Sequence, residues 1–269
     1  MIRRDTIFTN VALTKDNEPW WEGLDAGKPG IRLAGAALRS GEGARRPSEF
    51  ALHGFREAEP ELFADGRRPQ GVPITALVFG GRRRTLAPLV YQARDWAHGV
   101  LVGAGMASET TAAAAGDVGV VRRDPMAMKP FAGYNFADYW GHWLSMAKRL
   151  KQPPGIFHVN WFRRDTAGRF LWPGYGENLR VLAWIIARCS GSAKATDTAI
   201  GAVPTRDALD FSGIAIDSAT VDELLAVDTA AWRQEASEIG KYLDSYGARL
   251  PAAMREEVAR LAERLTRAG

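Results

Sequence analysis

The sequence predicts an α/β fold in which strands and helices are mixed and the last part of the chain is helical. Three observations lead to this prediction. Short apolar runs bounded by glycine or proline occur between residues 73 and 103 and again near residue 156, which is typical of strands. Large apolar residues recur at helical spacing in residues 134–150. Residues 218–269 combine helix caps with the same spacing.

The first 72 residues are the least regular part of the sequence. Residues 6–12 are strand-like, and a chain that opens on a strand resembles the middle of a domain rather than its start. Residues 23–72 are rich in Gly, Arg, Glu and Pro and show weak periodicity. We expect them to form an irregular excursion over the surface of one domain that spans residues 1–269.

The central region is predicted to supply the strands of the sheet. The four predicted strands are 75–79, 89–93, 99–103 and 156–162. A helix is predicted over 134–150, where Tyr139, Trp143 and Met146 share one face. Small residues dominate 103–119, so two structures remain open for this segment, a tightly packed helix or a mobile loop.

The C-terminal region, residues 218–269, is predicted to form three helices. Thr220 and Glu223 suit a capping box for the first helix, Asp228 suits the N-cap of the second, and Pro251 suits the start of the third. The apolar positions of the second and third helices are Trp232, Ala236, Ile239, Leu243, Met254, Val258, Leu261 and Leu265. Each set lies on one face of its helix, so both helices are expected to pack against a core.

Composition and charge exclude several classes of protein. The chain has 269 residues, a net charge of +4 and a pI near 9.3, but acidic residues are interleaved with its arginine clusters, so we expect no nucleic-acid partner. No signal pattern and no membrane-length apolar run is visible, so we expect a cytoplasmic protein without membrane contact. Cys189, the single cysteine, excludes an intrachain disulfide, and its helical spacing from Leu182, Ile185 and Ile186 predicts a core position.

Few residues of the sequence carry an obvious chemistry. The histidines lack metal-ligand spacing, and no phosphate-cradling Gly-x-x-x-x-Gly-Lys-Ser/Thr motif or hydrolase motif occurs, so no metal site, nucleophile or general base is predicted. Arg82, Arg83 and Arg84 follow a predicted strand and two glycines. Guanidinium groups in that position suit phosphate oxygens, and a solvated charged turn is the alternative.

Residues 160–180 are the most informative segment. They lie between a predicted strand and a predicted helix, contain three glycines and end on Glu177-Asn178. The aromatic residues of the segment are Trp161, Phe162, Phe170, Trp172 and Tyr175. Flat apolar rings and a placed amide are what a purine pocket needs, because stacking holds the ring and hydrogen bonds select the base. An aromatic loop packed into a core is the alternative.

Five motifs occur in the order and spacing found in GTP-dependent phosphoenolpyruvate carboxykinase. They are 79–83 (Phe-Gly-Gly-Arg-Arg), 108–114 (Ser-Glu-Thr-Thr-Ala-Ala-Ala), 124–128 (Asp-Pro-Met-Ala-Met), 130–136 (Pro-Phe-Ala-Gly-Tyr-Asn-Phe) and 160–180. The chain resembles the C-terminal part of this family over nearly its whole length, most weakly at 23–70.

The resemblance implies a fold, a reaction and a set of site residues. The fold is the C-terminal lobe of the carboxykinase fold, a mixed sheet flanked by helices. The reaction converts oxaloacetate and GTP into phosphoenolpyruvate, carbon dioxide and GDP, with Mn²⁺ or Mg²⁺. The guanine pocket consists of Phe162, Phe170 and Tyr175, with Trp161 and Asn178 beside it, and Arg82 is the catalytic residue at the phosphates. The implied lid spans 105–119 and includes Ser108, Glu109, Thr110, Thr111, Ala112, Ala113 and Ala114.

Two departures from the family affect the functional prediction. The phosphate loop and metal ligands of the family lie upstream of the part that this chain resembles, and Glu49 stands where the family has a substrate-binding arginine. We therefore expect a fragment or a truncated or split protein that is inactive alone, and the alternative is a non-catalytic paralogue that binds a guanine nucleotide or a partner. The strands are expected to leave a sheet edge and an apolar patch exposed, which predicts self-association or a companion polypeptide that supplies the N-terminal half.

Overall fold

The computed structural model of the chain describes residues 12–13, 19–20, 74–110 and 119–269. The chain divides into two units, Met1–Pro73 and Ile74–Gly269. In the first unit, strands β1 (Ala12–Leu13) and β2 (Pro19–Trp20) pair antiparallel. The predicted strand-like segment 6–11, the excursion 23–72 and Glu49 lie outside the described residues.

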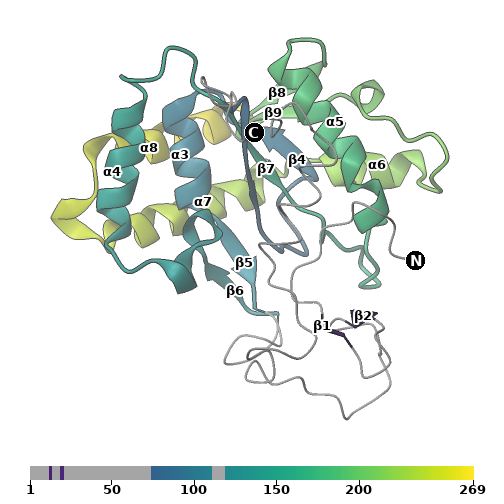
Figure 1. Cartoon of the computed structure of the whole chain (residues 1–269), viewed down its shortest axis with the longest axis horizontal. Coiled ribbons are helices and arrows are strands. Elements are labelled where there is room, and N and C mark those ends of the chain that lie inside the picture. The colour runs from purple at the N-terminus through teal and green to yellow at the C-terminus, as the bar shows by residue number, and fades with distance from the viewer. Residues whose placement is uncertain (1–11, 14–18, 21–73, 111–118) are drawn as a thin grey trace. The chain divides into compact units, whose positions relative to one another are not determined.

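The second unit is built on a five-stranded mixed sheet (Figure 1). Its strands, in spatial order, are β3 (Ala76–Gly80), β7 (Gly155–Val159), β4 (Val90–Gln92), β9 (Gly201–Pro204) and β8 (Ala195–Thr198). β3 and β7 run parallel, whereas the other neighbouring pairs run antiparallel. The prediction of a mixed sheet flanked by helices is therefore confirmed, with β3 at one edge.

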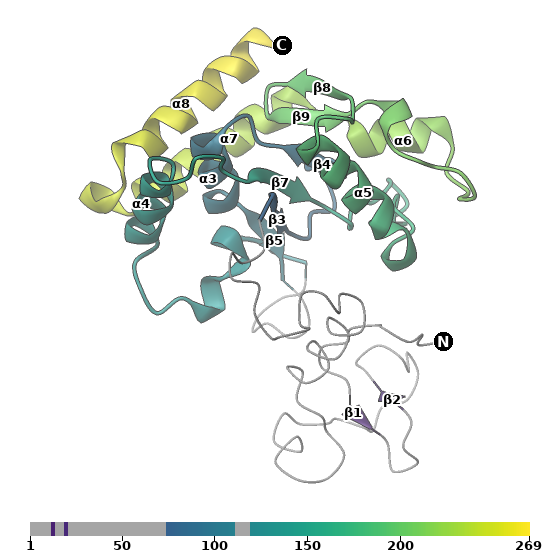
Figure 2. The same cartoon turned by 45° about the horizontal axis from the view of Figure 1, so that its top comes forward.

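Helices cover both faces of this sheet (Figures 1 and 2). One side holds α3 (Trp96–Ala104), α4 (Phe136–Met146), α7 (Thr229–Asp244) and α8 (Ala252–Arg267), and the other holds α5 (Asn178–Cys189) and α6 (Ser218–Leu225). Each side has its own core: Trp140, Leu243 and Leu265 belong to the first, and Phe157 and Trp184 to the second. Short 3₁₀ helices are η1 (Pro125–Ala127), η2 (Lys129–Phe131), η3 (Tyr175–Glu177), η4 (Arg206–Ala208) and η5 (Gly247–Arg249).

The predicted strand at 99–103 is wrong, because these residues lie within helix α3. Asp95 caps the helix by accepting a hydrogen bond from the backbone N–H of His98 at 2.8 Å. The helix passes so close to β7 that a Cβ built on Gly99 would overlap the side chain of Ile156. The small residues that looked like a short strand are therefore what lets a buried helix approach the sheet.

The remaining predicted helices are confirmed, with one cap corrected. Asp228 caps α7 through the backbone N–H groups of Ala230 and Ala231, and α8 begins directly after Pro251. The predicted capping box of α6 is wrong, because Thr220 lies inside the helix and Asp217 is its N-cap, 2.7 Å from the Thr220 N–H.

In the described part of residues 103–119, residues 103 and 104 end helix α3 and a strand follows at 107–109. β5 (Ala107–Glu109) pairs antiparallel with β6 (Val121–Arg123), with Ser108 opposite Arg122. Thr110 continues the pair, because its N–H donates to the carbonyl of Val120 at 2.9 Å. Residues 111–118, between the two strands, lie outside the described residues.

The predicted core position of Cys189 is wrong, because this cysteine is exposed on α5. The helix buries Val181, Trp184 and Ile185, which places Leu182, Ile186 and Cys189 on the opposite side. Apolar residues occupy both sides of this helix, so spacing alone selects the wrong face. Within the described residues, none of the helices has the length and apolar composition needed to cross a membrane.

Candidate functional site

The candidate site lies at the carboxyl ends of the two parallel strands, β3 and β7. Gly80, the last residue of β3, pairs in register with Val159, the last residue of β7. The arginine-rich loop therefore leaves the sheet beside the aromatic segment. In sheets of this kind, the carboxyl edge of parallel strands is where ligands commonly bind.

Asn160 joins these two segments directly after β7. Its side chain is fully buried; Oδ1 accepts from the N–H of Arg83 and of Phe162, each at 3.2 Å. Its Nδ2 donates to the carbonyls of Arg83 and Ala87, each at 2.9 Å. All four hydrogen bonds go to the backbone, so Asn160 fixes both loops with one side chain. Sequence reasoning missed this residue, and its signal is a polar amide directly after a buried strand.

The structure brings two of the predicted pocket residues together. The rings of Phe162 and Phe170 meet edge to face, with centroids 6.2 Å apart at an interplanar angle of 70°. Phe170 is 52% exposed, although an aromatic ring of this size ordinarily lies inside. A β-bridge between Arg164 and Phe170 closes the loop that carries the rings. The short hairpin therefore exposes apolar surface of Phe170.

Two arginine side chains cover these rings. The Arg82 guanidinium lies 4.9 Å from the centre of the Phe162 ring, and that of Arg164 lies 4.1 Å from the centre of the Phe170 ring. Both distances are within the range of cation–π attraction. The surface therefore combines flat apolar rings with positive charge, which suits a ligand that carries both a ring and an anionic group.

The other predicted pocket residues lie further along the segment. Tyr175 begins η3 and is 78% exposed, and it makes no ring contact with the two phenylalanines in the part of the chain that the structure describes. Asn178 is the first residue of α5, and its Oδ1 accepts from the indole N–H of Trp172 at 2.8 Å. Trp161 packs against the core beside Trp172. The segment therefore has features of both a purine pocket and a loop packed into a core. Trp172 is buried and Trp161 packs against the core, whereas Phe170 and Tyr175 are exposed.

The predicted lid residues that are described bind the arginine-rich loop. The N–H of Arg82 donates to Ser108 Oγ at 3.0 Å, and its carbonyl accepts from the N–H of Glu109 at 2.8 Å. Glu109 also accepts from the backbone N–H and the side-chain Nε of Arg84, each at 2.7 Å. The base of the segment is therefore held against the loop. Thr111, Ala112, Ala113 and Ala114 lie outside the described residues.

The arginines of the loop differ in their partners. Arg83 pairs with Glu235 of α7 at 3.1 Å, and Arg123 of β6 pairs with the same carboxylate at 2.7 Å. Burial raises the pKa of Glu235, but the hydrogen bond and charge of Arg83 and the charge of Arg123 outweigh burial, so its pKa lies below the ordinary value. Across residues 74–110 and 119–269, Arg82 pairs with no carboxylate. Its charge remains available to an anion.

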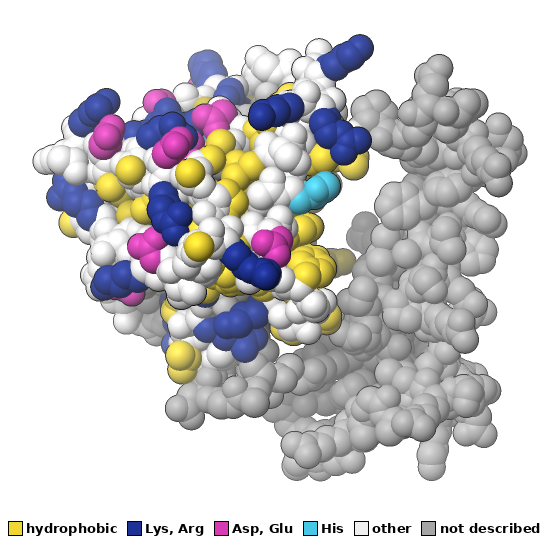
Figure 3. Space-filling model, turned by 90° about the vertical axis from the view of Figure 1, so that its left-hand side faces the viewer, with side chains coloured by type: hydrophobic (Ala, Val, Ile, Leu, Met, Phe, Trp, Pro, Cys, Tyr) yellow, Lys and Arg dark blue, Asp and Glu magenta, His cyan; other side chains and the backbone are white. Residues whose placement is uncertain are grey.

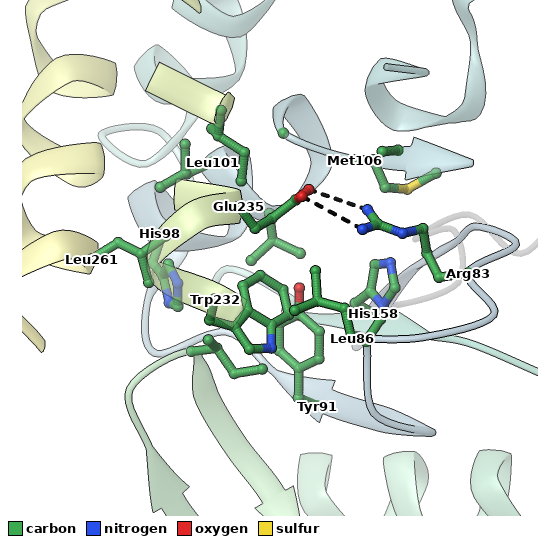
Figure 4. A pocket seen from close by; sticks show the side chains of 16 residues that line it. Arg83, Leu86, Tyr91, His98, Leu101, Met106, His158, Trp232, Glu235 and Leu261 are labelled. Carbon is green, nitrogen blue, oxygen red and sulfur yellow. Dashed lines mark hydrogen bonds and ion pairs between the residues drawn. The ribbon is translucent and has the colours of Figure 1, made fainter. Parts of the chain in front are cut away.

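A small interior cavity of about 40 Å³ lies behind the arginine-rich loop (Figure 4). Arg83, Glu235, Tyr91, His158 and Trp232 are among its lining residues, and the Tyr91 and His158 rings stack with centroids 5.1 Å apart. A space of this size accommodates water and no nucleotide. The cavity is therefore not the ligand site, but it places buried polar groups next to Arg83.

No metal site is found among the described residues, and the face drawn in Figure 3 carries charges of both signs. No group of three His, Cys, Asp or Glu residues there is placed to hold a metal ion, so the described residues do not fit Mn²⁺ or Mg²⁺ as a resident cofactor. On the face shown in Figure 3, Lys and Arg side chains are interspersed with Asp and Glu. Such a surface does not favour a nucleic-acid backbone as ligand.

Comparison with known proteins gives one consistent family. The family model described as the phosphoenolpyruvate carboxykinase C-terminal P-loop domain matches residues 1–264. The carboxykinase named phosphoenolpyruvate carboxykinase [GTP] from Anaeromyxobacter dehalogenans (strain 2CP-C) is 45% identical over 269 residues, covering 98% of this chain and 45% of the relative.

Two further relatives carry the same name. The protein of Chlamydia muridarum is 45% identical over 265 residues, covering 97% of this chain and 44% of its own length. The protein of Neocallimastix frontalis is 45% identical over 276 residues, covering 97% of this chain and 45% of its own length. The chain therefore spans less than half the length of the curated relatives that it matches.

Proposed function

The chain belongs to the phosphoenolpyruvate carboxykinase C-terminal P-loop domain family, and from this premise we propose that it binds a guanine nucleotide at the carboxyl ends of β3 and β7. The observation that carries the proposal is the pair of Phe162 and Phe170 rings beside the guanidinium of Arg82, which pairs with no carboxylate among the described residues. The relatives are named for GTP, which supports a guanine base as the ligand.

The base is proposed to stack on the rings of Phe162, Phe170 and Tyr175. A purine buries a flat apolar face in such a contact, and each base–aromatic stack contributes about 1–3 kcal/mol. Phe170 and Tyr175 are 52% and 78% exposed, so a stacked base would remove apolar area from water. Trp161 is partly buried and packs against the core on the α5 side of the sheet, so its proposed place is beside the base.

The phosphates are proposed to bind Arg82. Glu235 pairs with Arg83 and Glu109 pairs with Arg84 at 2.7 Å, so within the part of the chain that the structure describes Arg82 is the loop arginine without a carboxylate. A guanidinium group binds phosphate oxygens in bidentate fashion. Ser108 Oγ accepts a hydrogen bond from the Arg82 N–H, and the Glu109 N–H donates to the Arg82 carbonyl. These two contacts support a lid role for 105–119, because the first residues of the lid and the phosphate-binding arginine would then move together.

The reaction proposed for the complete protein is the carboxykinase reaction: oxaloacetate and GTP give phosphoenolpyruvate, carbon dioxide and GDP. This chain alone is proposed to be inactive, because metal and phosphate-loop electrostatics supply most of the catalysis of phosphoryl transfer, and the phosphate loop and metal ligands of the family lie upstream of the part that this chain resembles. The described residues are proposed to bind the base and the phosphates.

Titration calorimetry of the purified chain with GDP and with ADP tests the proposal, with and without Mn²⁺. GDP is expected to bind more tightly than ADP, and Phe170→Ala is expected to weaken GDP binding by about tenfold or more, which corresponds to the loss of one stack. Phe131→Ala is the matched control, because Phe131 is an exposed aromatic residue on a different element, η2. A folded, monodisperse wild-type chain that binds no GDP would contradict the proposal.

A second candidate function is binding of a nucleotide or a partner without catalysis. The specific observation that favours a partner is the exposed apolar surface of α5, where Leu179, Leu182 and Ile186 face solvent. Both candidates predict GDP binding by this chain. An assay of GTP-dependent oxaloacetate decarboxylation in the native host, with this gene deleted, separates them, because only the first predicts a loss of carboxykinase activity.

A further inference from the structure

Trp172 holds the side chain of Asn178 in one orientation. The indole Nε1 lies 2.8 Å from Asn178 Oδ1. Trp172 is only 1% exposed and belongs to the core on the α5 side of the sheet, so its ring is fixed by packing. Asn178 is half-buried at the first position of α5. The hydrogen bond therefore joins a fixed donor to an amide at the rim of the aromatic segment.

The chemistry of the indole decides which end of the amide faces it. An indole N–H donates hydrogen bonds and accepts none, so only the carbonyl oxygen of Asn178 can face Trp172. The amino group, Nδ2, must then point the other way. No described residue accepts a hydrogen bond from Nδ2. A flipped amide would set two donors against each other inside a half-buried site, which is strongly disfavoured.

The amide is not needed to cap the helix. The N-cap position of α5 is Glu177, and it makes no side-chain capping hydrogen bond. At the start of α4, by contrast, Asn135 accepts a hydrogen bond from the N–H of Ala137 at 2.9 Å. The Asn178 side chain is turned away from its own helix and into the hydrogen bond with Trp172. Capping of α5 therefore does not explain why an amide stands at position 178 or why it has this orientation.

We infer that Trp172 is a positioning residue that makes the site select a base with a hydrogen-bond acceptor at its edge. The two N–H donors of Asn178 Nδ2 suit a purine carbonyl oxygen, as in guanine or hypoxanthine, and oppose the exocyclic amino group of adenine. This inference rests on the proposed function. In this inference, the orientation of the Asn178 amide discriminates between bases. The buried Trp172 indole fixes that orientation without touching the base.

The test compares Trp172→Phe with Trp184→Phe in binding GDP, IDP and ADP. Trp184 is a matched control, because it lies in the same core and donates to the carbonyl of Lys194 at 3.1 Å, away from Asn178. The wild type is expected to bind GDP and IDP in preference to ADP. Trp172→Phe keeps a buried ring but frees the amide to rotate, so the IDP-to-ADP preference is expected to fall by about tenfold, the value of one hydrogen bond. Trp184→Phe is expected to keep the wild-type preference.

A second variant, Asn178→Asp, is designed to reverse the preference between IDP and ADP. Asn178→Asp keeps an acceptor for Trp172 and replaces the outward donors with an acceptor, so it is expected to favour ADP over IDP relative to the wild type. Circular dichroism verifies the fold of each variant, and Asn178→Asp decides the question if Trp172→Phe does not fold. An unchanged IDP-to-ADP preference in folded Trp172→Phe, or in Asn178→Asp, overturns the inference. Absence of GDP binding by the wild type contradicts the proposed function instead.

Discussion

His158 is buried at the centre of the sheet, with its ring stacked on Tyr91 and its Nδ1 without a hydrogen-bond partner among the described residues. Burial, together with the charge of Arg83, lowers the pKa of His158 to about 4. His98, on α3, is in a similar position, because burial and the charge of Arg264 lower its pKa to about 3. Both imidazoles are therefore neutral in the folded protein at neutral and mildly acidic pH.

These two histidines make the protein sensitive to mild acid. A histidine in the unfolded chain has a pKa near 6.5, so the unfolded state binds more protons than the folded state between pH ~6.5 and ~4. The contribution of these histidines to the free energy of unfolding is therefore fully present above pH ~6.5. It decreases as the pH falls below this value, by about 1.4 kcal/mol per pH unit for each histidine.

Replacing His158 with Phe is expected to remove one of these two contributions while keeping a ring against Tyr91. The slope of the unfolding free energy between pH 6 and 5 should fall by about 1.4 kcal/mol per pH unit, measured by urea denaturation. His142→Phe is the control, because His142 is exposed and loses no hydration on folding. An equal slope in wild type and His158→Phe contradicts this prediction.

Some residue roles were visible in the sequence and others were not. The exposed rings of Phe170 and Tyr175 could be singled out, because five aromatic residues lie together with glycines and a terminal amide. The roles of Asn160 and Trp172 depend on hydrogen bonds to groups that the fold brings together, such as Asn160 with Arg83. Local spacing carries no information about such contacts, so these two residues needed the structure.

At the scale of elements, helix α3 shows where a periodicity argument fails. A three-residue apolar run between glycines, as in 99–103, fits a buried strand and a buried helix equally well. Length and caps decide between them, and Asp95 lies four residues before Gly99, outside the run that suggested a strand. The strands at 75–79 and 89–93 were predicted correctly because β-branched and aromatic residues supported the period.

Two glycines on neighbouring helices are expected to respond oppositely to alanine. A Cβ at Gly99 would overlap Ile156 of β7, whereas at Gly141 of α4 its nearest atom would be Pro251 Cγ, at 3.5 Å. Gly99→Ala should destabilise the protein by about 1–3 kcal/mol through overpacking. Gly141→Ala should stabilise it by up to about 1 kcal/mol through helix propensity. Urea denaturation measures both, and a stabilising Gly99→Ala would disprove the close approach of α3 to the sheet.

At the scale of the whole molecule, apolar side chains are exposed beside β3, an edge strand among the described residues, and on the outer face of α5. Cys189 Sγ of α5 lies 3.4 Å from the carbonyl of Thr75, which shows that the helix borders the strand. Ile74 and Val78 on the strand side and Leu182 and Ile186 on the helix side are exposed. An open strand edge beside apolar side chains favours association with another chain.

The purified chain is therefore expected to self-associate through this surface. Sedimentation equilibrium should show a weight-average mass that rises with protein concentration, and Ile186→Lys should suppress this rise, because Ile186 is 67% exposed and a lysine there would have to be desolvated. Val121→Lys, on β6, is the control at a comparably exposed position. A mass equal to that of the monomer at all concentrations would contradict the prediction.

The sequence was sufficient for the fold class and the family, but not for the arrangement of the sheet. β8 and β9 are consecutive and form a hairpin, but β7 pairs with β3 and β4, both far upstream in the sequence. Strand order depends on these long-range pairings, which a linear pattern does not encode. The irregular excursion at 23–72 remains a prediction.

The parallel pairing of β3 with β7 also has a kinetic consequence. Gly80 and Val159 are roughly 80 residues apart along the chain. Their pairing therefore requires a long loop to close, at a cost in chain entropy, before contacts between the strands can stabilise it. The helices α7 and α8, which are close in sequence, can dock far earlier. Until the strands join, the arginine and the aromatic rings are separate pieces of unfolded polypeptide. Completion of the ligand site should therefore coincide with a late step of folding, and a nucleotide that traps this step would slow unfolding while leaving early collapse unchanged.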